Sequence, residues 1–325
     1  MSYQDGQPLL SSKRSPGTFG KSVMDSEELK LPQAIAHRGF RAQFPENTIL
    51  AFEGAVKAGA HAIETDLHLS RDGVVMISHD ATLKRVFGEE GKVIDCDYSY
   101  LKTLRTLEAP HVPMASLKEV LELLCQPALR KMWLLLDIKI DNNAENIIRL
   151  TAETLNDVGG GVEFWGNRVV LGCWTLNFIP LCERYLPGFP ITHIGYSIPY
   201  AREFLEIPNV SFNMLYAILD GPKGEKFLKD ARAAGRDVYT WTVNDEQVMK
   251  WTIAHGIDGV CTDDPVKFLD ICEKYLNGEV SSEPWSCRMA FVLMYYQFLA
   301  YIFSYLFRCR HGFTLKTAEK AHLAP

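Results

Sequence analysis

Apolar and polar side chains alternate along most of residues 62–69, which read AIETDLHL. A period of two is typical of a β-strand, so the pattern predicts a strand that carries Glu64, Asp66 and His68 on one face. Closely spaced carboxylates are the hard oxygen ligands that divalent cations prefer. The pattern therefore makes this strand the first candidate for a functional site.

A β-hairpin is expected to follow this strand. Asp72-Gly73 is typical of a two-residue turn, and residues 74–79 form the predicted return strand. The register of such a turn places His79 directly opposite Asp66, and opposed side chains point to the same side of a sheet. Glu64, Asp66 and His79 would then share one face. That face is either a metal site with an acid–base group or a solvated polar face on an edge hairpin.

The segment before the alternating strand carries further polar groups. Residues 34–36 form a short predicted strand that ends in His37-Arg38-Gly39. Pro45-Glu46-Asn47-Thr48 indicates a turn and the start of a helix, with Asn47 or Thr48 as the N-cap. This helix is expected to end at Gly59.

Predicted strands and helices alternate through the rest of the chain, after a helix start capped by Ser116. Strands are expected at 132–138, 168–174, 191–197, 209–214, 237–243 and 258–262, and helices at 144–157, 177–185, 224–234 and 245–255. Strands separated by helices favour a parallel sheet, and this many favour a (β/α)8 TIM barrel. The candidates number nine. Either the antiparallel return strand lies outside the ring of eight, or one later candidate is not a barrel strand.

A barrel would explain why the polar motifs occur together. Active sites of this fold lie at the C-terminal ends of the strands. Seven polar or aromatic residues fall at or near such ends, namely His37, Glu64, Asp66, Asp137, Lys139, Trp241 and Thr262. Packing requirements alone do not account for that placement.

The C-terminal segment has a different composition. Residues 289–307 contain no charged side chain, and arginines flank them on both sides. As a helix they would extend about 28 Å, close to the hydrocarbon thickness of a bilayer. Four groups recur on one helical face, which permits a helix in the membrane interface instead of a span: Gln297, Tyr301, Ser304 and Arg308. We expect membrane contact, and the alternative is a helix packed on the barrel.

Composition narrows the class of protein. A net charge of −6 argues against a nucleic-acid partner. Residues 1–30 lack the apolar run of a secretory signal and are expected to be disordered. The eight cysteines show no metal-like spacing, so we expect reduced thiols in a membrane-associated protein that faces the cytosol. The expected layout is a barrel over 31–277 with an insertion at about 81–114, then a linker, membrane segment and basic tail over 278–325. The oligomeric state is left open.

Several motifs, in this order and spacing, resemble the signature of the glycerophosphodiester phosphodiesterase family: His37-Arg38-Gly39, Pro45-Glu46-Asn47-Thr48, Glu64-Thr65-Asp66 and His79-Asp80. The resemblance is strongest to the fungal phosphatidylglycerol phospholipase C branch, through Leu136-Asp137-Ile138-Lys139, Trp241-Thr242-Val243-Asn244 and Thr262-Asp263-Asp264-Pro265. It covers roughly residues 33–277 and implies the TIM-barrel fold, with the small insertion that this family carries above its barrel.

The resemblance also implies a role for each matching residue. His37 and His79 would be the general acid–base pair. Arg38 and Lys139 would hold the phosphate oxygens of the substrate. Trp241 would pack on the glycerol of the substrate.

The implied metal ligands are Glu64, Asp66 and Asp137, for Mg²⁺ or Ca²⁺. Asp137 departs from the family, in which glutamate is usual at this place. Aspartate is one methylene shorter, so a cation would bind it through water or lie closer to this strand. Direct ligation is therefore better supported for Glu64 and Asp66 than for Asp137.

The family's reaction is implied to start from a hydroxyl of the substrate's own glycerol, which attacks the neighbouring phosphorus and forms a cyclic phosphate. The first hypothesis is a phospholipase C that converts phosphatidylglycerol to diacylglycerol and glycerol phosphate at an endoplasmic reticulum, lipid droplet or mitochondrial surface. The second is a phosphodiesterase of glycerophosphodiesters or lysophospholipids, with lysophospholipase D activity. The third is a catalytically inactive membrane scaffold, which the presence of every motif residue disfavours.

Overall fold

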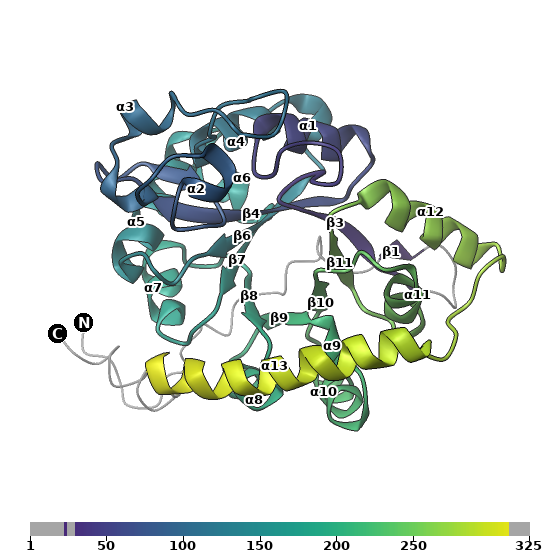
Figure 1. Cartoon of the computed structure of the whole chain (residues 1–325). Helices are drawn as coiled ribbons and strands as arrows, with labels where there is room; N and C mark the ends of the chain where they lie inside the picture. The colour runs from purple at the N-terminus through teal and green to yellow at the C-terminus, as the bar shows by residue number, and fades with distance from the viewer. Residues whose placement is uncertain (1–22, 25–29, 312–325) are drawn as a thin grey trace.

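Eight parallel strands close into a barrel in the computed structural model, which describes residues 23–24 and 30–311 (Figure 1). In ring order they are β3 (Gln33–His37), β4 (Ala62–Leu69), β6 (Trp133–Ile138), β7 (Val169–Cys173), β8 (Ile191–Gly195), β9 (Val210–Leu215), β10 (Val238–Trp241) and β11 (Gly259–Thr262). β11 pairs again with β3, which closes the ring. The (β/α)8 barrel predicted from the sequence is confirmed.

Two short pairings lie outside the ring. β5 (Val75–Ile77) pairs antiparallel with the end of β4, so the return strand is not one of the eight. β1 (Val23–Met24) pairs antiparallel with β2 (Lys30–Leu31).

Helices surround the ring of strands (Figure 1). The longer ones are α1 (Ile49–Lys57), α4 (Leu117–Leu124), α5 (Ala144–Asp157), α7 (Phe178–Tyr185), α8 (Ile198–Leu205), α10 (Pro222–Ala233), α11 (Glu246–Ala254), α12 (Pro265–Leu276) and α13 (Cys287–His311). The shorter ones are α2 (Lys84–Phe87), α3 (Tyr98–Leu101), α6 (Gly161–Trp165) and α9 (Tyr216–Leu219).

The predicted helix starts have a local cause in side-chain caps. Thr48 is the N-cap of α1, because its Oγ1 accepts a hydrogen bond from the Ala51 amide. Ser116 and Glu119 form a reciprocal capping box at α4. Both predicted caps are therefore confirmed, with Thr48 and not Asn47 in that role.

The barrel interior changes from apolar to charged along the strands. Ile35, Ala62 and Leu135 belong to a buried apolar cluster inside the ring. Because side chains alternate in a strand, the residues two positions further along continue the same face. These residues are His37, Glu64 and Asp137. The apolar layers therefore form the base on which the charged end of the barrel rests.

The hairpin after β4 differs from its prediction by one residue in register. Leu67 pairs with Ile77, and Ser78, not His79, lies across from Asp66, whose carbonyl accepts from the Ser78 amide. The turn has three residues instead of two, because Ser70 pairs with Val74 and Gly73 adopts a φ of 85°. The predicted register, which placed His79 directly opposite Asp66, is therefore wrong. His79 still lines the pocket with Asp66, because it follows the end of β5.

Residues 81–114 fold against the outer end of this hairpin. They contain α2 and α3, whose apolar side chains form a cluster separate from the main core. Val93, Leu101 and Met114 are buried in that cluster together with Met76 of β5. This small core holds the segment beside the charged end of the barrel.

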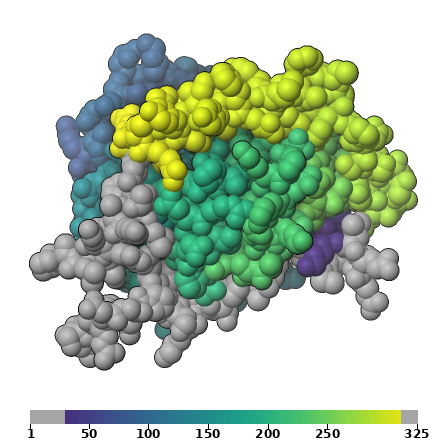
Figure 2. Space-filling model, turned by 90° about the horizontal axis from the view of Figure 1, so that it is seen from below, coloured from purple at the N-terminus to yellow at the C-terminus, as the bar shows by residue number. Residues whose placement is uncertain are grey.

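The predicted C-terminal helix is present as α13, and it packs lengthwise on the barrel (Figures 1 and 2). Gln297 Nε2 donates to the Ala217 carbonyl of α9, and Arg308 pairs with Glu203 of α8. Met289, Leu293 and Ala300 of the same helix are buried. The alternative of a helix packed on the barrel thus holds for one face of α13.

The opposite face of α13 is exposed and apolar. Its exposed large side chains are Phe291, Met294, Tyr295, Tyr296, Phe298, Tyr301, Ile302, Phe303, Tyr305 and Leu306. Cys287–Arg310 is the helix within the described residues that is long and apolar enough to cross a membrane. The disorder expected for residues 1–30 falls almost wholly outside the described residues, as does the basic tail after residue 311.

Candidate active site at the barrel mouth

The C-terminal ends of the strands form a pocket that contains all eight residues to which the family resemblance assigns a role. Those eight are His37, Arg38, Glu64, Asp66, His79, Asp137, Lys139 and Trp241. Strand register accounts for the core of this arrangement, because His37 pairs with Glu64 and Asp66 pairs with Asp137. Parallel strands end at the same edge, so residues distant in sequence meet here.

Three carboxylates form the centre of the pocket. Oxygens of Glu64, Asp66 and Asp137 lie within 4.8 Å of one another, and all three residues are buried. Burial raises the pKa of Glu64 well above its usual value, and the charges of Asp66 and Asp137 raise it further. The cluster therefore carries unfavourable like-charge repulsion that a cation would relieve.

Two cationic side chains neutralise part of this charge. Lys139 Nζ lies 2.6 Å from both Asp66 Oδ1 and Asp137 Oδ2. Arg38 Nε lies 3.5 Å from Asp66 Oδ2 and is buried without a hydrogen-bond partner among the described residues. Burial alone would raise the pKa of Asp66, but Lys139 and Arg38 hold it below its usual value. Asp66 is therefore ionised at neutral pH.

The carboxylate of Asp263 fixes the orientation of His37 through its Nδ1. Its Nδ1 lies 2.6 Å from Asp263 Oδ1, and its Nε2 lies 4.0 Å from Glu64 Oε2. Asp263 is itself held by Arg41 and by Asn244 Nδ2. Burial lowers the pKa of His37, although the hydrogen bond to Asp263 opposes that shift. The arrangement leaves Nε2 as the ring nitrogen on the side of the carboxylate cluster.

His79, which also lines the pocket, is held in the same way. Its Nδ1 lies 2.7 Å from Asp80 Oδ1, and Asp80 accepts from Arg85 Nε at 2.6 Å. Burial also lowers the pKa of His79. Each histidine therefore has a carboxylate on Nδ1, which is the arrangement that orients an imidazole for proton transfer through Nε2.

The Pro45-Glu46-Asn47-Thr48 turn provides ion-pair and hydrogen-bond partners for these groups. Glu46 pairs with Arg38, Arg41 and Arg85, and its pKa falls to about 2 because the arginines outweigh the effect of burial. Asn47 Nδ2 donates to Asp66 Oδ2 at 2.7 Å. One turn thus connects the phosphate-binding candidate Arg38 to the carboxylate Asp66.

Sequence reasoning missed Trp174. It follows β7, and its Nε1 donates to Asp137 Oδ1 at 2.6 Å. Its ring lies 5.9 Å from that of Trp241, centroid to centroid. The signal was its place at the end of a predicted strand, but no motif marked it. Trp241 itself is oriented by a hydrogen bond from Nε1 to the Asn213 carbonyl.

His68 was predicted to share a face with Glu64 and Asp66, but it is not among the residues that line the pocket. It is buried, with Nδ1 3.6 Å from Asp141 Oδ1 and Nε2 3.4 Å from the His79 carbonyl. It therefore supports the backbone of His79 from outside the pocket.

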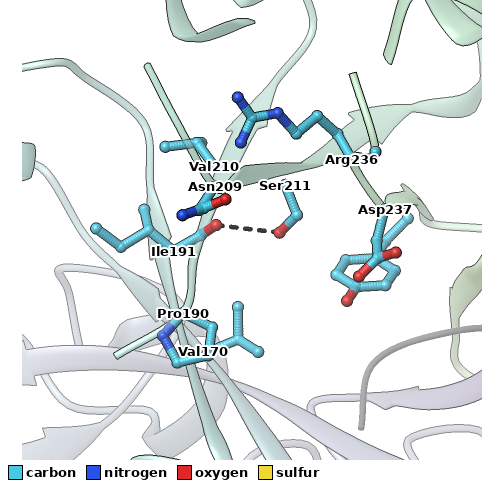
Figure 3. Close-up of a pocket in the computed structure, with 10 residues that line it drawn as sticks. Val170, Pro190, Ile191, Asn209, Val210, Ser211, Arg236 and Asp237 are labelled. Atoms are coloured by element: carbon cyan, nitrogen blue, oxygen red, sulfur yellow. Dashed lines mark hydrogen bonds between the residues drawn. The ribbon is translucent and has the colours of Figure 1, made fainter. Parts of the chain in front are cut away.

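A second hollow lies at the opposite end of the barrel (Figure 3). There Ser211 Oγ donates to the Ile191 carbonyl at 3.0 Å, and Arg236 Nη2 donates to the Ile207 carbonyl. Among the described residues, the group of clustered metal-ligating side chains is at the mouth and not here. These bonds secure the turns that enter the strands.

The barrel fold and the charged groups at its mouth are together typical of a hydrolase that acts on an anionic ester. The chain belongs to the glycerophosphoryl diester phosphodiesterase family, because residues 37–267 match the model of that family. It is therefore a phosphoric diester hydrolase by family, with its candidate residues where barrel enzymes carry their active sites.

Known relatives agree with this family. The chain is 30% identical to the lysophospholipase D GDPD1 of Mus musculus over 283 residues, which cover 75% of this chain and 87% of that protein. It is 26% identical to a glycerophosphodiester phosphodiesterase of Bacillus altitudinis over 251 residues, covering 75% and 99%.

Solved structures show the same fold. A glycerophosphoryl diester phosphodiesterase from Silicibacter pomeroyi superposes with a TM-score of 0.67 at 20% identity, covering 83% of this chain and all of that one. A phosphodiesterase from Oleispira antarctica, in complex with the product sn-glycerol-3-phosphate, gives a TM-score of 0.64 at 23% identity, covering 74% and 97%.

Proposed function

We propose that this protein is a membrane-associated, metal-dependent phospholipase C that cleaves phosphatidylglycerol to diacylglycerol and glycerol phosphate. The observation that carries the lipid assignment is the position of α13. This helix contacts the segments that follow β8 and β9, through Phe307 on Tyr196 and Gln297 on Ala217, and Ser286 just before the helix contacts Gln247 after β10. Those segments belong to the mouth of the barrel, so an exposed apolar helix lies beside the mouth.

The three carboxylates fit a hard divalent cation. Glu64, Asp66 and Asp137 would supply oxygen ligands. Burial raises the pKa of Glu64, and the charges of Asp66 and Asp137 raise it further, a repulsion that a cation would relieve. A bound Mg²⁺ or Ca²⁺ would neutralise charge on the phosphate oxygens at this place. Asp137 already accepts from Trp174 and Lys139, so it is the ligand whose oxygens are most constrained.

The cationic residues are suited to hold the phosphate. Arg38 has a buried Nε without a hydrogen-bond partner among the described residues, and its Nη1 is fixed on Glu46. Lys139 lies between Asp66 and Asp137, beside the carboxylate cluster. Trp241 walls the same pocket and would pack on the glycerol.

The reaction needs a base and an acid close to the phosphorus. His37 and His79 meet that need, since each has Nδ1 on a carboxylate and Nε2 available. One takes the proton of the head-group hydroxyl as its oxygen bonds to phosphorus. The other donates a proton to the diacylglycerol oxygen as the P–O bond breaks. Water then opens the cyclic phosphate, and the two histidines exchange their roles as base and acid in this step.

A head group with a neighbouring hydroxyl gains a large effective concentration for this attack. Phosphatidylglycerol has such a hydroxyl and carries two acyl chains, which agrees with an apolar helix at the mouth. The exposed row on α13 would lie in the membrane interface with the barrel on the cytosolic side. The anchoring of both ends of α13 to the barrel, by Trp285 on Asp220 and Arg308 on Glu203, favours an interfacial helix over a span.

A second candidate is a lysophospholipase D or glycerophosphodiesterase, and the identity to the mouse lysophospholipase D favours it. The same site would accept such substrates, because they also have a free hydroxyl beside the phosphate ester. An inactive scaffold is disfavoured, because all eight candidate residues line one pocket.

The products decide between the two enzymatic candidates. Purified full-length protein in mixed detergent micelles is expected to convert phosphatidylglycerol to diacylglycerol and glycerol phosphate, measured by mass spectrometry. Choline released from lysophosphatidylcholine, with phosphatidylglycerol left intact, would establish the second candidate instead. If neither substrate is cleaved when Mg²⁺ or Ca²⁺ is present, both candidate functions are contradicted.

The histidine pair can be tested by kinetics on the same substrate. His37→Ala and His79→Ala should each lower kcat by about 10²-fold or more, the typical contribution of a positioned acid or base. His111→Ala, outside the pocket, should keep the kcat of the wild type. A folded His37→Ala or His79→Ala protein, checked by circular dichroism, that retained near-wild-type kcat would rule out the assignment.

The membrane role of α13 can be tested without removing the helix. The double substitution Phe298→Asp and Tyr305→Asp should prevent sedimentation with phosphatidylglycerol vesicles, since each charge disfavours apolar lipid by about 2.5–3.5 kcal/mol at full depth. Activity in detergent micelles should remain. The matched Phe298→Leu and Tyr305→Leu protein should sediment like the wild type. Equal vesicle binding by the Asp and Leu pairs would contradict membrane contact through this face.

A further inference from the structure

Arg85 belongs to α2, in the segment over residues 81–114 that folds beside the charged end of the barrel. Two of its neighbours along the chain, Leu83 and Phe87, are buried in the small core of that segment. Their packing fixes the backbone from which the side chain of Arg85 extends. The guanidinium is therefore carried by a packed part of the chain, although the side chain itself is 46% exposed.

The guanidinium of Arg85 binds two carboxylates at once. Its Nη1 and Nη2 donate to Oε2 and Oε1 of Glu46 at 2.9 and 2.7 Å, which is a bidentate pair. Its Nε and Nη2 donate to Oδ2 and Oδ1 of Asp80 at 2.6 and 3.2 Å. Such a double contact needs several donors in fixed directions, which a planar guanidinium has and a lysine ammonium lacks.

Glu46 is the fixed end of this series of contacts. It is buried, and it also pairs at 3.0 Å with Nη1 of Arg38 and at 3.0 Å with Nε of Arg41. Burial alone would raise the pKa of Glu46, but the three arginines lower it to about 2. Arg85 thus connects an anchored, ionised carboxylate of the barrel to Asp80.

Asp80 transmits the contact to His79. Its Oδ1 lies 2.7 Å from Nδ1 of His79. Burial alone would raise the pKa of Asp80, but the hydrogen bonds from Arg85 and His79 lower it to about 2. An ionised carboxylate only accepts hydrogen bonds, so Nδ1 of His79 is the donor. The Nε2 of His79 is then the nitrogen that remains for proton exchange with a substrate.

The two histidines differ in how their carboxylates are held. Asp263, on His37, accepts from side chains that follow the barrel strands β3 and β10. Asp80, on His79, accepts its two further bonds from Arg85, which lies outside the ring of strands. The orientation of His79 therefore depends on a contact that the barrel strands do not supply.

We propose that Arg85, held by Glu46, is a positioning residue that orients His79 through Asp80. The proposal rests on the proposed acid–base role of His79 and not on the identity of the lipid. It gives the segment over residues 81–114 a part in catalysis. Arg85 is not among the residues that line the pocket, so its loss should slow the reaction of bound substrate and leave substrate binding unchanged.

The first test is the kinetics of full-length Arg85→Gln in detergent micelles, on whichever of phosphatidylglycerol and lysophosphatidylcholine the wild type cleaves. We expect kcat to fall about tenfold with KM within about twofold, because a positioned acid or base supplies about 10²-fold or more and only its orientation is lost. Arg85→Lys keeps the charge without the fork and should recover part of this loss. Lys84→Gln removes the neighbouring charge, which pairs with Glu90, and should keep the kcat of the wild type.

A double-substitution cycle tests whether Arg85 acts through Asp80. Asp80→Asn should itself lower kcat, because an uncharged amide orients an imidazole less well than a carboxylate does. Adding Arg85→Gln to Asp80→Asn should lower kcat no further, since the carboxylate that transmits the effect is already absent. The exposed ion pairs of Arg85 should contribute little to stability, and thermal unfolding checks that every variant is folded.

NMR gives a readout that does not depend on turnover. In full-length protein labelled with ¹⁵N-histidine, the Nδ1 proton of His79 should give a downfield resonance, assigned by its absence from His79→Ala. Arg85→Gln should shift or broaden this resonance, because the bond to Asp80 loses its fixed geometry. Lys84→Gln should leave the resonance where it is in the wild type.

These outcomes are separable from those of the proposed function. If the wild type cleaves neither lipid, the acid–base roles fail, and the His79 resonance alone decides whether Arg85 orients this ring. A resonance that changes in Arg85→Gln and not in Lys84→Gln supports the positioning role. An unchanged resonance in Arg85→Gln, a kcat equal to that of the wild type, or losses that multiply in the double variant would each overturn the proposal.

Discussion

Three carboxylates forced together inside a barrel mouth are the constraint on which the rest of the site depends. Strand register brings Glu64, Asp66 and Asp137 within 4.8 Å, where burial and like charge disfavour full ionisation. Lys139 and Arg38 offset part of the repulsion, and Asn47 and Trp174 fix two of the carboxylates by hydrogen bonds. The motifs that seemed separate in sequence are the parts of one charge-balanced structure.

α13 lies beside the same mouth. In the proposed function, a lipid substrate would pass from hydrocarbon to this charged site, and the exposed face of α13 offers apolar surface beside it. Trp174 links the two regions, because its Nε1 donates to Asp137 and its ring contacts Tyr196, which in turn contacts Phe307 of α13. In the proposed function, the pocket and the exposed face of α13 act together on a lipid substrate.

The sequence was most informative where local rules decide the structure. Alternation predicted β4, and side-chain oxygens predicted the caps at Thr48 and Ser116. The fold followed from strands alternating with helices. The register after Asp72-Gly73 was wrong because one extra turn residue, accommodated by Gly73 at positive φ, shifts every pairing by one. Trp174 and the two faces of α13 depend on contacts between distant segments, and local patterns do not encode such contacts.

The central claim is that the three carboxylates bind one divalent cation, and crystallography with Mn²⁺ tests it most directly. Crystals of the full-length protein grown with Mn²⁺ should give one anomalous peak at the barrel mouth. We predict that it lies within about 2.6 Å of an oxygen from Glu64 and from Asp66, with Asp137 bound directly or through one water. Saturating Mn²⁺ without a peak at this cluster, or with a peak only elsewhere, would contradict the account.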